Sequence, residues 1–425
     1  MENPRWTSYK ILYDVLYKGA YSNIAINQSL RKSALQNQER GFVTELVYGT
    51  LEKKIFLEYV IKRFSKTPID KLSDEVRLVL LMGLYQIRFL DSVKDFAAVD
   101  ESVKLCKKVF PKGSGFVNGL LRNVLRDENA FELLVKDEKK ALAIEHSVST
   151  DIVKLLVSQY GLTETKRMLR AFDEKPKIYL RANMLKTNRE ELQSILLADG
   201  ISAEPVELEE AALRVKGFKR LDESAAYRQG LFTVQDLSSM LTVRTMAPQP
   251  EECILDLCSC PGGKTTFAAE LMGNCGSILA RDISSAKLSL VQSACERLGI
   301  TIVQTEASDA TIFEEKLTNR FDRVLVDAPC SGLGILRKKP EIRYKTKEEI
   351  EPLYEIQRQI LSNAAKYVKR GGVLLYSTCT VNQEENENQI RDFLRKNDFE
   401  LQEEKCILMQ EGESDGFYIA KLLKK

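Results

Sequence analysis

The stretch Cys253–Thr265, CILDLCSCPGGKT, combines the signals of a strand, a turn and a helix. Ile254 to Leu257 form a short apolar run typical of a buried strand, and Pro261-Gly262-Gly263 then breaks the chain. An apolar-periodic segment follows from Lys264, which predicts a helix. Because glycine has no side chain, such a turn lets a ligand approach the backbone, and the helix offers free N–H groups. The stretch therefore predicts a ligand-binding loop at the end of a buried strand.

Apolar strands alternate with helical segments in the part of the chain that follows this region. The alternation predicts an α/β, Rossmann-like domain over residues 236–425, with a parallel, doubly wound sheet. The predicted strands are Ile254–Leu257, Ile278–Asp282, Ile302–Glu306, Arg323–Asp327 and Val373–Ser377. Ligands bind such sheets at the carboxyl ends of the strands. Four acids stand at those ends: Asp256, Asp282, Asp309 and Asp327.

The glycine loop matches neither of two common nucleotide-binding fingerprints. It is not GxGxxG, which disfavours a nicotinamide dinucleotide. It ends like a P-loop, GGKTT, but the first glycine of that motif would have to stand where the chain has Cys258. Four acids at strand ends beside one glycine turn favour a nucleoside ligand. S-adenosylmethionine fits, because carboxylates bind its hydroxyls and backbone N–H groups bind its carboxylate.

The composition is that of an ordinary globular protein, with 44% hydrophobic and 29% charged residues. No apolar run approaches the roughly 18 to 20 residues of a membrane span, and the N-terminus MENPRWTSYK lacks the layout of a signal peptide. We therefore expect a cytoplasmic protein that makes no membrane contact. The nine cysteines are an odd number and include no CxxC pair, so the sequence predicts neither a disulfide framework nor a metal site.

Charge is distributed unevenly along the chain. Residues 1–150 hold 24 Lys+Arg against 19 Asp+Glu, and residues 151–425 hold 39 against 42. A basic front half permits contact with nucleic acid without establishing it. The single histidine, His146, lies near a predicted domain junction and far from the glycine loop, so we expect it to have no chemical role.

Helical periodicity runs through the front of the chain, from Trp6 to about Glu138. No strand-like alternation interrupts it, so residues 1–140 are predicted to form an all-α bundle. A charge-rich run at Lys136–Lys140 begins a connector. Residues 141–235 are predicted to hold connector helices and a small α+β domain. The chain is thus expected to have three domains, the third being the α/β domain.

Two cysteine motifs follow the fourth and fifth predicted strands: Asp327-Ala328-Pro329-Cys330-Ser331-Gly332 and Tyr376-Ser377-Thr378-Cys379. If those strands are neighbours, their axes lie about 4.8 Å apart and both thiols project into one pocket. A thiolate that attacks carbon 6 of cytosine makes carbon 5 able to accept a methyl cation, so the pair suits a covalent methyltransferase. Asp327 is then placed to hold or protonate the ring nitrogen. The alternative is that both cysteines are small buried hydrophobes, as most free cysteines are.

The front of the chain resembles the NusB-type RNA-binding bundle. The motifs that carry the resemblance are Arg40–Phe42, Glu45–Thr50, Ala97–Glu101 and Phe116–Arg122. A packing role in any helical bundle is the alternative. The resemblance implies that cations of this domain contact RNA phosphates, the candidates being Arg31, Lys32, Arg40, Lys107, Lys108, Lys112 and Arg122.

The rest of the chain resembles the RNA 5-methylcytosine methyltransferases. Arg181-x-Asn183 is similar to a motif of their small RNA-facing domain, which implies RNA contacts by Arg181 and Asn183. Gly230–Asp236 is similar to their entry into the catalytic domain, and its other interpretation is an N-capped helix that begins near Asp236. With the bundle included, nearly the whole chain is similar to the RsmB (Sun/Fmu) type, which modifies small-subunit (16S) ribosomal RNA.

This resemblance implies roles that the two cysteine motifs alone leave open. Cys379 would be the nucleophile, Cys330 would assist product release, and Asp327 would contact the base. The methyl donor would be S-adenosylmethionine and the partner ribosomal RNA, with no protein partner implied. The cofactor residues that carry over are Cys258, Ser259, Cys260, Pro261, Gly262, Gly263, Lys264, Asp282, Asp309 and Asp327.

The chain departs from the family pattern at Ser259-Cys260, where two alanines are usual, and at Arg281, beside Asp282. The loop replacements are small, so we expect the turn to survive and Cys260 to be structural. Two other functions stay open. One is a 5-methylcytosine methyltransferase acting on transfer RNA, which the bundle disfavours only through resemblance. The other is a non-catalytic, NusB-like RNA-binding factor, against which the cysteine pair argues.

Overall fold

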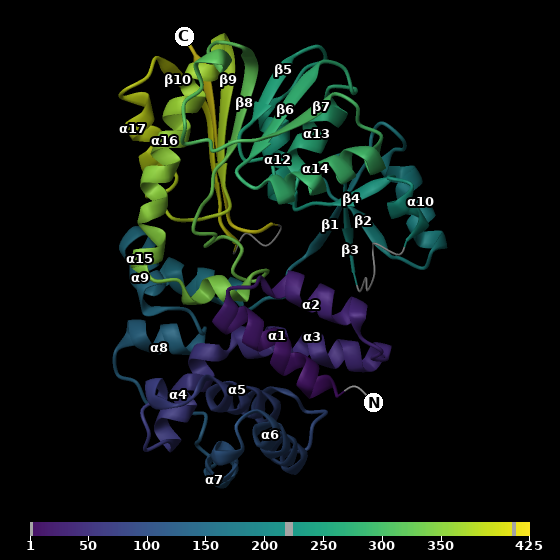
Figure 1. The fold of residues 1–425 in the computed structure, drawn as a ribbon. Coiled ribbons are helices and arrows are strands. Elements are labelled where there is room, and N and C mark those ends of the chain that lie inside the picture. Colours follow the sequence, from purple (N-terminus) through teal and green to yellow (C-terminus); the bar gives the residue numbers. More distant parts are fainter. Residues whose placement is uncertain (1–2, 217–223, 410–413) are drawn as a thin grey trace. The chain divides into compact units, whose positions relative to one another are not determined.

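The computed structural model describes residues 3–216, 224–409 and 414–425. The chain divides into two compact units. The first joins Met1–Asp173 to the later segment Leu336–Lys347, and the second holds Glu174–Ile335 and Glu348–Lys425. We call them the helical unit and the sheet unit (Figure 1). The three predicted domains therefore fall into two units, and the connector helices after residue 140 group with the bundle.

The helical unit contains the predicted all-α bundle. Its helices are α1 (Pro4–Lys18), α2 (Ser22–Lys32), α3 (Asn37–Glu52), α4 (Lys54–Phe64), α5 (Asp74–Phe89), α6 (Asp95–Val109), α7 (Ser114–Arg126), α8 (Glu138–Glu145) and α9 (Thr150–Phe172). Apolar residues at helical spacing become its core, and α5 is buried along most of its length, from Val76 to Gln86. The segment inserted from the sheet unit carries a 3-10 helix, Pro340–Tyr344.

A small antiparallel sheet opens the sheet unit, with strand order β2-β3-β1-β4. Its elements are β1 (Ile178–Ala182), α10 (Arg189–Ala198), β2 (Ala203–Pro205), β3 (Ala212–Val215), α11 (Ala225–Arg228) and β4 (Phe232–Val234). This is the predicted small α+β domain. Helix α12 (Leu237–Met246) follows, with Asp236 at its N-cap accepting from the N–H of Ser238, so the predicted helix start is confirmed.

The large sheet has seven strands in the order β10-β11-β9-β8-β5-β6-β7. The strands are β5 (Cys253–Asp256), β6 (Ser277–Asp282), β7 (Val303–Ala307), β8 (Phe321–Asp327), β9 (Val368–Thr378), β10 (Phe399–Ile407) and β11 (Phe417–Lys424). The helices between them are α13 (Gly263–Leu271), α14 (Ser285–Leu298), α15 (Lys347–Ile350), α16 (Pro352–Tyr367) and α17 (Glu387–Leu394). The five predicted strands are present and pair in parallel. The sheet as a whole is mixed, because β10 and β11 add an antiparallel hairpin beside β9.

Side chains of each strand alternate between two cores, because successive residues of a strand point to opposite faces. Ile254 and Leu325 face the core that α12, α13 and α14 cover, whereas Leu255 and Val324 face the core under α16 and α17 (Figure 1). The chain order reverses between β5 and β8, which are neighbours. In open α/β sheets a ligand crevice forms at such a reversal, outside the carboxyl ends of the strands.

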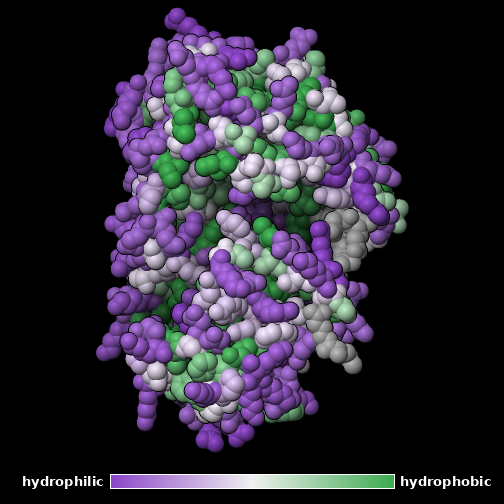
Figure 2. Space-filling model, viewed as in Figure 1, coloured by the Kyte–Doolittle hydropathy of each residue, from purple (hydrophilic) through white to green (hydrophobic). Residues whose placement is uncertain are grey.

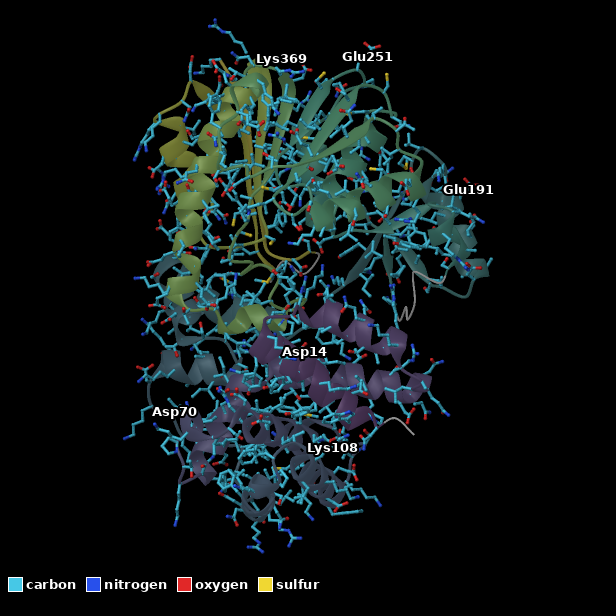
Figure 3. The ribbon with its side chains drawn as sticks, in the orientation of Figure 1. Asp14, Asp70, Lys108, Glu191, Glu251 and Lys369 are labelled. Carbon is cyan, nitrogen blue, oxygen red and sulfur yellow. The ribbon has the colours of Figure 1, made fainter. Side chains whose placement is uncertain are left out.

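The visible surface is predominantly polar, with hydrophobic residues in small groups (Figure 2). Charged side chains such as Asp14, Lys108 and Lys369 lie along the helices and strands of both units (Figure 3). No helix among the described residues has the length and apolar content needed to cross a membrane.

Candidate active site

The glycine loop connects β5 to α13 at the carboxyl end of the large sheet. Gly262 has a φ of +100°, and its N–H donates to the carbonyl of Ser259 at 2.7 Å. A Cβ at this position would lie 3.2 Å from the Cα of Val291, so both conformation and space favour glycine. The N–H of Ser259 also donates to the carbonyl of Arg281 at 2.8 Å, which ties the loop to β6. The predicted strand, turn and helix are therefore confirmed.

A cavity of about 190 Å³ lies between this loop and the start of α12. The predicted cofactor residues that line it are Cys258, Ser259, Cys260, Pro261, Gly263, Lys264 and Asp327. Val234, Gln235, Asp236, Ser239 and Asp256 complete the wall. Gln235 and Ser239 were not assigned a role from the sequence. The available signal was the motif Gly230–Asp236, which resembles the entry into the family's catalytic domain and also predicts a helix start; folding brings this segment to the glycine loop.

Two of the predicted cofactor acids stand beside the loop and not in the cavity wall. Asp282, at the end of β6, accepts from the N–H groups of Cys260 at 3.3 Å and Ser284 at 3.0 Å. Asp309, beyond β7, accepts from the N–H of Thr311 at 2.9 Å and from its hydroxyl at 2.7 Å. Both acids follow neighbouring parallel strands, as predicted. Their contact with a cofactor stays a prediction.

Gln235 supplies an unpaired donor to the cavity wall. Arg181 donates to its Oε1, which fixes the orientation of the amide. Its Nε2 is buried and has no hydrogen-bond partner in the structure. A buried N–H group without a partner costs free energy that a ligand acceptor recovers. Together with the carboxylates of Asp256 and Asp327, this donor makes the wall fit a polar ligand with both donors and acceptors, as S-adenosylmethionine is.

The two predicted reactive thiols meet at the ends of adjacent strands. β8 and β9 are parallel neighbours with Asp327 opposite Ser377, so the condition set by the sequence analysis is met. The Sγ atoms of Cys330 and Cys379 are 3.3 Å apart. The hydrogen bond between the thiols and burial raise the pKa of Cys330 well above its usual value, with the charges of Glu385 and Asp327 adding to the effect. Cys330 is thereby kept as a protonated thiol, a proton donor beside the sulfur of Cys379.

Asp327 connects the cysteine pair to the glycine loop. Its Oδ2 lies 2.6 Å from the ammonium of Lys264, and its Oδ1 accepts from the hydroxyl of Ser377 at 2.8 Å. Lys264 Nζ also lies 5.1 Å from the ring centroid of Phe417. A charged acceptor and a charged donor therefore stand together in the cavity wall, and the bond to Ser377 joins Asp327 to β9, the strand that precedes Cys379. Such a pair suits recognition of a polar ring.

The two cysteines of the glycine loop, Cys258 and Cys260, are protonated thiols, as Cys330 is. Burial raises the pKa of Cys258 well above its usual value, and the surrounding carboxylates add to the effect. Burial and the neighbouring Asp282 raise the pKa of Cys260 to about 12. Both therefore stay protonated at neutral pH, and a neutral thiol is a poor nucleophile.

Burial contradicts the predicted RNA contacts of Arg181 and Asn183, whose side chains are fully buried. Arg181 forms an ion pair with Glu270 and donates to the carbonyl of Gly263 at 2.8 Å, under the glycine loop. Asn183 donates to the carbonyls of Gly230 at 2.8 Å and Leu298 at 2.9 Å. Two polar residues at strand spacing share one face of the sheet, but the motif does not reveal whether that face is buried or exposed. Here it faces the interior and joins the small sheet to the catalytic part of the same unit.

Of the seven cations of the helical unit that were predicted to contact RNA, Arg40 and Arg122 have different surroundings. Arg40 is half-buried and donates to the carbonyls of Leu35 at 2.9 Å and Ser33 at 3.2 Å, so its guanidinium supports the turn before α3. Arg122 on α7 is exposed and lines an open groove with Phe96 of α6. Contact of either residue with RNA stays a prediction.

His146 has contacts of a structural kind. Its Nδ1 lies 2.7 Å from Asp173 Oδ2, and its carbonyl accepts from Arg343 Nη1 at 2.8 Å. All three residues belong to the helical unit. That His146 has no chemical role stays a prediction.

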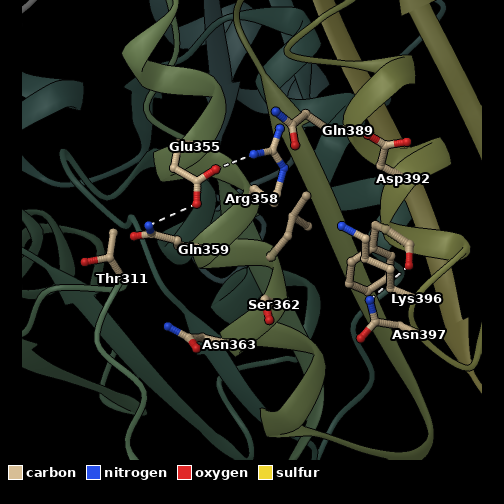
Figure 4. Close-up of a pocket in the computed structure, with 12 residues that line it drawn as sticks. Thr311, Glu355, Arg358, Gln359, Ser362, Asn363, Gln389, Asp392, Lys396 and Asn397 are labelled. Carbon is tan, nitrogen blue, oxygen red and sulfur yellow. Dashed lines mark hydrogen bonds and ion pairs between the residues drawn. The ribbon is translucent and has the colours of Figure 1, made fainter.

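A larger groove, of about 410 Å³, lies along α16 and α17 (Figure 4). Two of its charged side chains bind each other: Arg358 pairs with Glu355, whose other oxygen accepts from Gln359 Nε2 at 3.1 Å. None of the predicted cofactor residues lines this groove, whereas seven of them line the smaller cavity; neither cysteine of the pair is part of either wall. We therefore place the candidate active site at the smaller cavity and the cysteine pair.

Three family models match consecutive parts of this chain. The NusB family matches residues 2–126, the RsmF/B-like ferredoxin-like domain residues 152–222, and the 16S rRNA methyltransferase RsmB/F family residues 243–423. The resemblance that the sequence motifs indicated is thereby confirmed.

Relatives and solved structures agree over the full chain length. Probable ribosomal RNA small subunit methyltransferase B of Bacillus subtilis is 38% identical over 96% of this chain and 95% of that protein. The protein of the same name from Synechocystis is 35% identical over the whole of both chains. The crystal structure of PH0851 has a TM-score of 0.86 and 27% identity, covering 100% of this chain and 99% of that one. A methyltransferase homologue from Pyrococcus horikoshii has a TM-score of 0.61 and 26% identity, covering 68% and 100%. The chain therefore belongs to the RsmB/F family of S-adenosylmethionine-dependent 16S rRNA methyltransferases.

Proposed function

We propose that this methyltransferase modifies carbon 5 of a cytidine in small-subunit ribosomal RNA through a covalent cysteine–cytosine adduct. The observation that carries the proposal is the pair of sulfurs 3.3 Å apart, Cys330 and Cys379, beside the ion pair of Asp327 and Lys264. Cytosine carbon 5 is a weak nucleophile, and a thiol positioned to add to carbon 6 is the established chemical way to activate it.

Each residue of the site has one task in this reaction. The sulfur of Cys379 bonds to carbon 6, which places electron density on carbon 5. The ring nitrogen beside the exocyclic amine takes up a proton during the addition, and Asp327, which is paired with the ammonium of Lys264, passes that proton to it. Carbon 5 then gains the methyl group, and its proton passes to water. The bond between Cys379 and carbon 6 breaks, Cys379 leaves as a thiolate, and the ring nitrogen returns its proton to Asp327. Cys330, a protonated thiol 3.3 Å from Cys379, assists this release.

The cavity at the glycine loop would hold S-adenosylmethionine, which supplies an electrophilic methyl group when bound. Gln235 Nε2 and the backbone of the loop offer donors, and Asp256, Asp282 and Asp309 offer acceptors for an amino group or hydroxyls. Lys264 belongs both to the cavity wall and to the ion pair with Asp327. It therefore keeps the acid that contacts the base at the edge of the cavity.

The two thiol roles are separable by mutation. With purified protein, small-subunit RNA and labelled S-adenosylmethionine, Cys379→Ala should abolish methyl transfer, since no adduct forms. Cys330→Ala should accumulate a covalent protein–RNA adduct, visible as a slowly migrating gel band. Cys275→Ala, which changes an exposed cysteine, should behave like the wild type.

The opposite pattern, an adduct in Cys379→Ala and none in Cys330→Ala, would mean that the roles are exchanged. The nature of the product is tested separately by mass spectrometry of the reacted RNA. Labelled nucleosides other than 5-methylcytidine would contradict the proposal.

A further inference from the structure

We propose that Glu385 is a positioning residue that holds the loops of Cys330 and Cys379 together and so sets the distance between their thiols. The inference rests on the proposed function, which assigns the chemistry to this pair. Glu385 lies between β9 and α17, and its side chain is fully buried.

The carboxylate of Glu385 accepts hydrogen bonds from both cysteine loops. Its Oε1 accepts from the backbone N–H of Ser331 at 2.7 Å, and the hydroxyl of Ser331 donates to Oε2. Oε2 also accepts from Asn382 Nδ2 at 3.0 Å, and the hydroxyl of Thr380 lies 3.4 Å from Oε2 and 2.8 Å from the hydroxyl of Ser331. Ser331 directly follows Cys330, and Thr380 directly follows Cys379. One side chain therefore binds the residue after each reactive cysteine.

A third attachment holds the other side of Cys330. Gln357 of α16 donates through Nε2 to Glu385 Oε1 at 3.0 Å and to the carbonyl of Pro329 at 2.9 Å. Pro329 directly precedes Cys330, so hydrogen bonds hold the backbone on both sides of this cysteine. The backbone of Glu385 is held as well, since its carbonyl accepts from the hydroxyl of Tyr376 at 2.7 Å.

The groups around Glu385 require both of its side-chain oxygens to accept hydrogen bonds. The groups that bind Glu385 in the structure are amides and hydroxyls, and none of these is a cation. A carboxylate accepts at both oxygens, whereas the amide of a glutamine would turn an N–H toward one set of donors. Asn382 cannot readily reverse its amide, because its Oδ1 accepts from the N–H of Glu384 at 3.2 Å. A buried charge is tolerated when its hydrogen bonds are this complete, and the arrangement makes the two loops one rigid body.

Cross-linking of the two thiols measures their relative position without RNA. Diamide oxidises two neighbouring thiols to a disulfide: both S–H bonds break, the S–S bond forms, and the reagent's N=N group takes up the two hydrogens. Formation of the Cys330–Cys379 bond is followed by peptide mapping, as a loss of two hydrogens. In the wild type the sulfurs need to approach only from 3.3 Å to about 2.0 Å, so the bond should form rapidly.

Glu385→Gln and Glu385→Ala should form this disulfide about tenfold more slowly or slower still, because a loop freed from a charged hydrogen bond samples other positions. Ser331→Ala, which cuts one attachment, should give a smaller decrease. Glu209→Gln is the matched control, since Glu209 is a buried carboxylate that binds Arg244 in the same unit and contacts neither cysteine loop. Melting temperatures of all variants separate loss of position from loss of fold, and Glu385→Gln and Ser331→Ala carry the test if Glu385→Ala does not fold.

Methyl transfer supplies the second readout. Glu385→Gln should lower kcat about tenfold and leave the KM for S-adenosylmethionine unchanged, because the glycine loop keeps its own bonds. If the wild type does not methylate cytosine, the proposed function fails while the cross-linking result still tests Glu385. If the wild type is active and folded Glu385→Gln cross-links and methylates at the wild-type rate, the positioning role is overturned alone.

Discussion

Asp256 shows at the scale of one residue how burial sets a chemical state. It lies at the end of β5, 1% exposed, where its Oδ2 accepts from the hydroxyl of Thr265 at 2.7 Å. Burial raises the pKa of Asp256 to about 7, and the charge of Asp327 adds to the rise while Thr265 opposes it. The sequence identified Asp256 as a strand-end acid, but its protonation depends on contacts that only the folded chain makes.

Replacing this acid should make stability less dependent on pH. The folded pKa of Asp256 lies above the unfolded value, so the folded state binds an extra proton between about pH 4 and 7. Its contribution to stability is present at low pH and is lost as pH rises through that window. Asp256→Asn should therefore raise the free energy of unfolding relative to the wild type at pH 8, by on the order of 1–3 kcal/mol, with little gain at pH 4.

Urea unfolding of wild type and variant at the two pH values measures this difference. Asp199→Asn, an exposed carboxylate in the same unit, should show no such pH dependence. An equal gain for Asp256→Asn at both pH values would show that the effect does not come from titration of this carboxyl.

At the scale of elements, the loop after β8 depends on close backbone contacts. The N–H of Gly334 donates to the carbonyl of Cys379 at 3.0 Å, and the carbonyl of Gly334 accepts from the N–H of Gly416 at 2.9 Å. Glycine is required here by space, since a Cβ would lie 1.9 Å from the carbonyl oxygen of Gly416. The loop that carries Cys330 is thus fastened between the end of β9 and the start of β11.

Gly334→Ala should therefore damage both stability and the site. The methyl group has no room, so the loop must shift, and we expect a loss of roughly 2 kcal/mol or more in unfolding free energy and slower diamide cross-linking of Cys330 to Cys379. Gly115→Ala is the control, because nothing lies within 4 Å of a Cβ at that helical position. It should keep or slightly increase stability. Unchanged melting and cross-linking in Gly334→Ala would contradict the packing argument.

At the scale of the whole chain, the inserted segment Leu336–Lys347 is part of the helical unit although the sheet unit flanks it in sequence. Arg343 anchors it. This side chain is 1% exposed, and its guanidinium donates to the carbonyls of His146 at 2.8 Å and Phe172 at 2.6 Å. The segment begins six residues after Cys330 in the chain.

Arg343→Met should release this segment. The substitution keeps much of the side-chain volume but leaves buried carbonyls without donors, which costs about 1–3 kcal/mol each. We expect faster proteolysis within Leu336–Lys347 and a lower melting temperature of the helical unit. Arg358→Met, at an arginine that is about half exposed on α16, should change neither. Wild-type protease resistance in Arg343→Met would show that the segment is held by other contacts.

Much of the architecture follows from the sequence because its cause is local. Hydrophobic periodicity and the glycines at turns predicted the all-α front and the five parallel strands near their observed bounds. The positions of two motifs after neighbouring strands predicted that Cys330 and Cys379 lie together. These features depend on neighbours in the chain and on the common edge at which parallel strands end.

The tertiary structure decided what depends on contacts between distant residues. It turned Arg181 inward to pair with Glu270 and brought Gln235 to the glycine loop. It also placed one carboxylate, Glu385, against the residues that follow both reactive cysteines. No local pattern records these outcomes, because a polar residue is stabilised in the interior only where the rest of the fold supplies its hydrogen-bond partners.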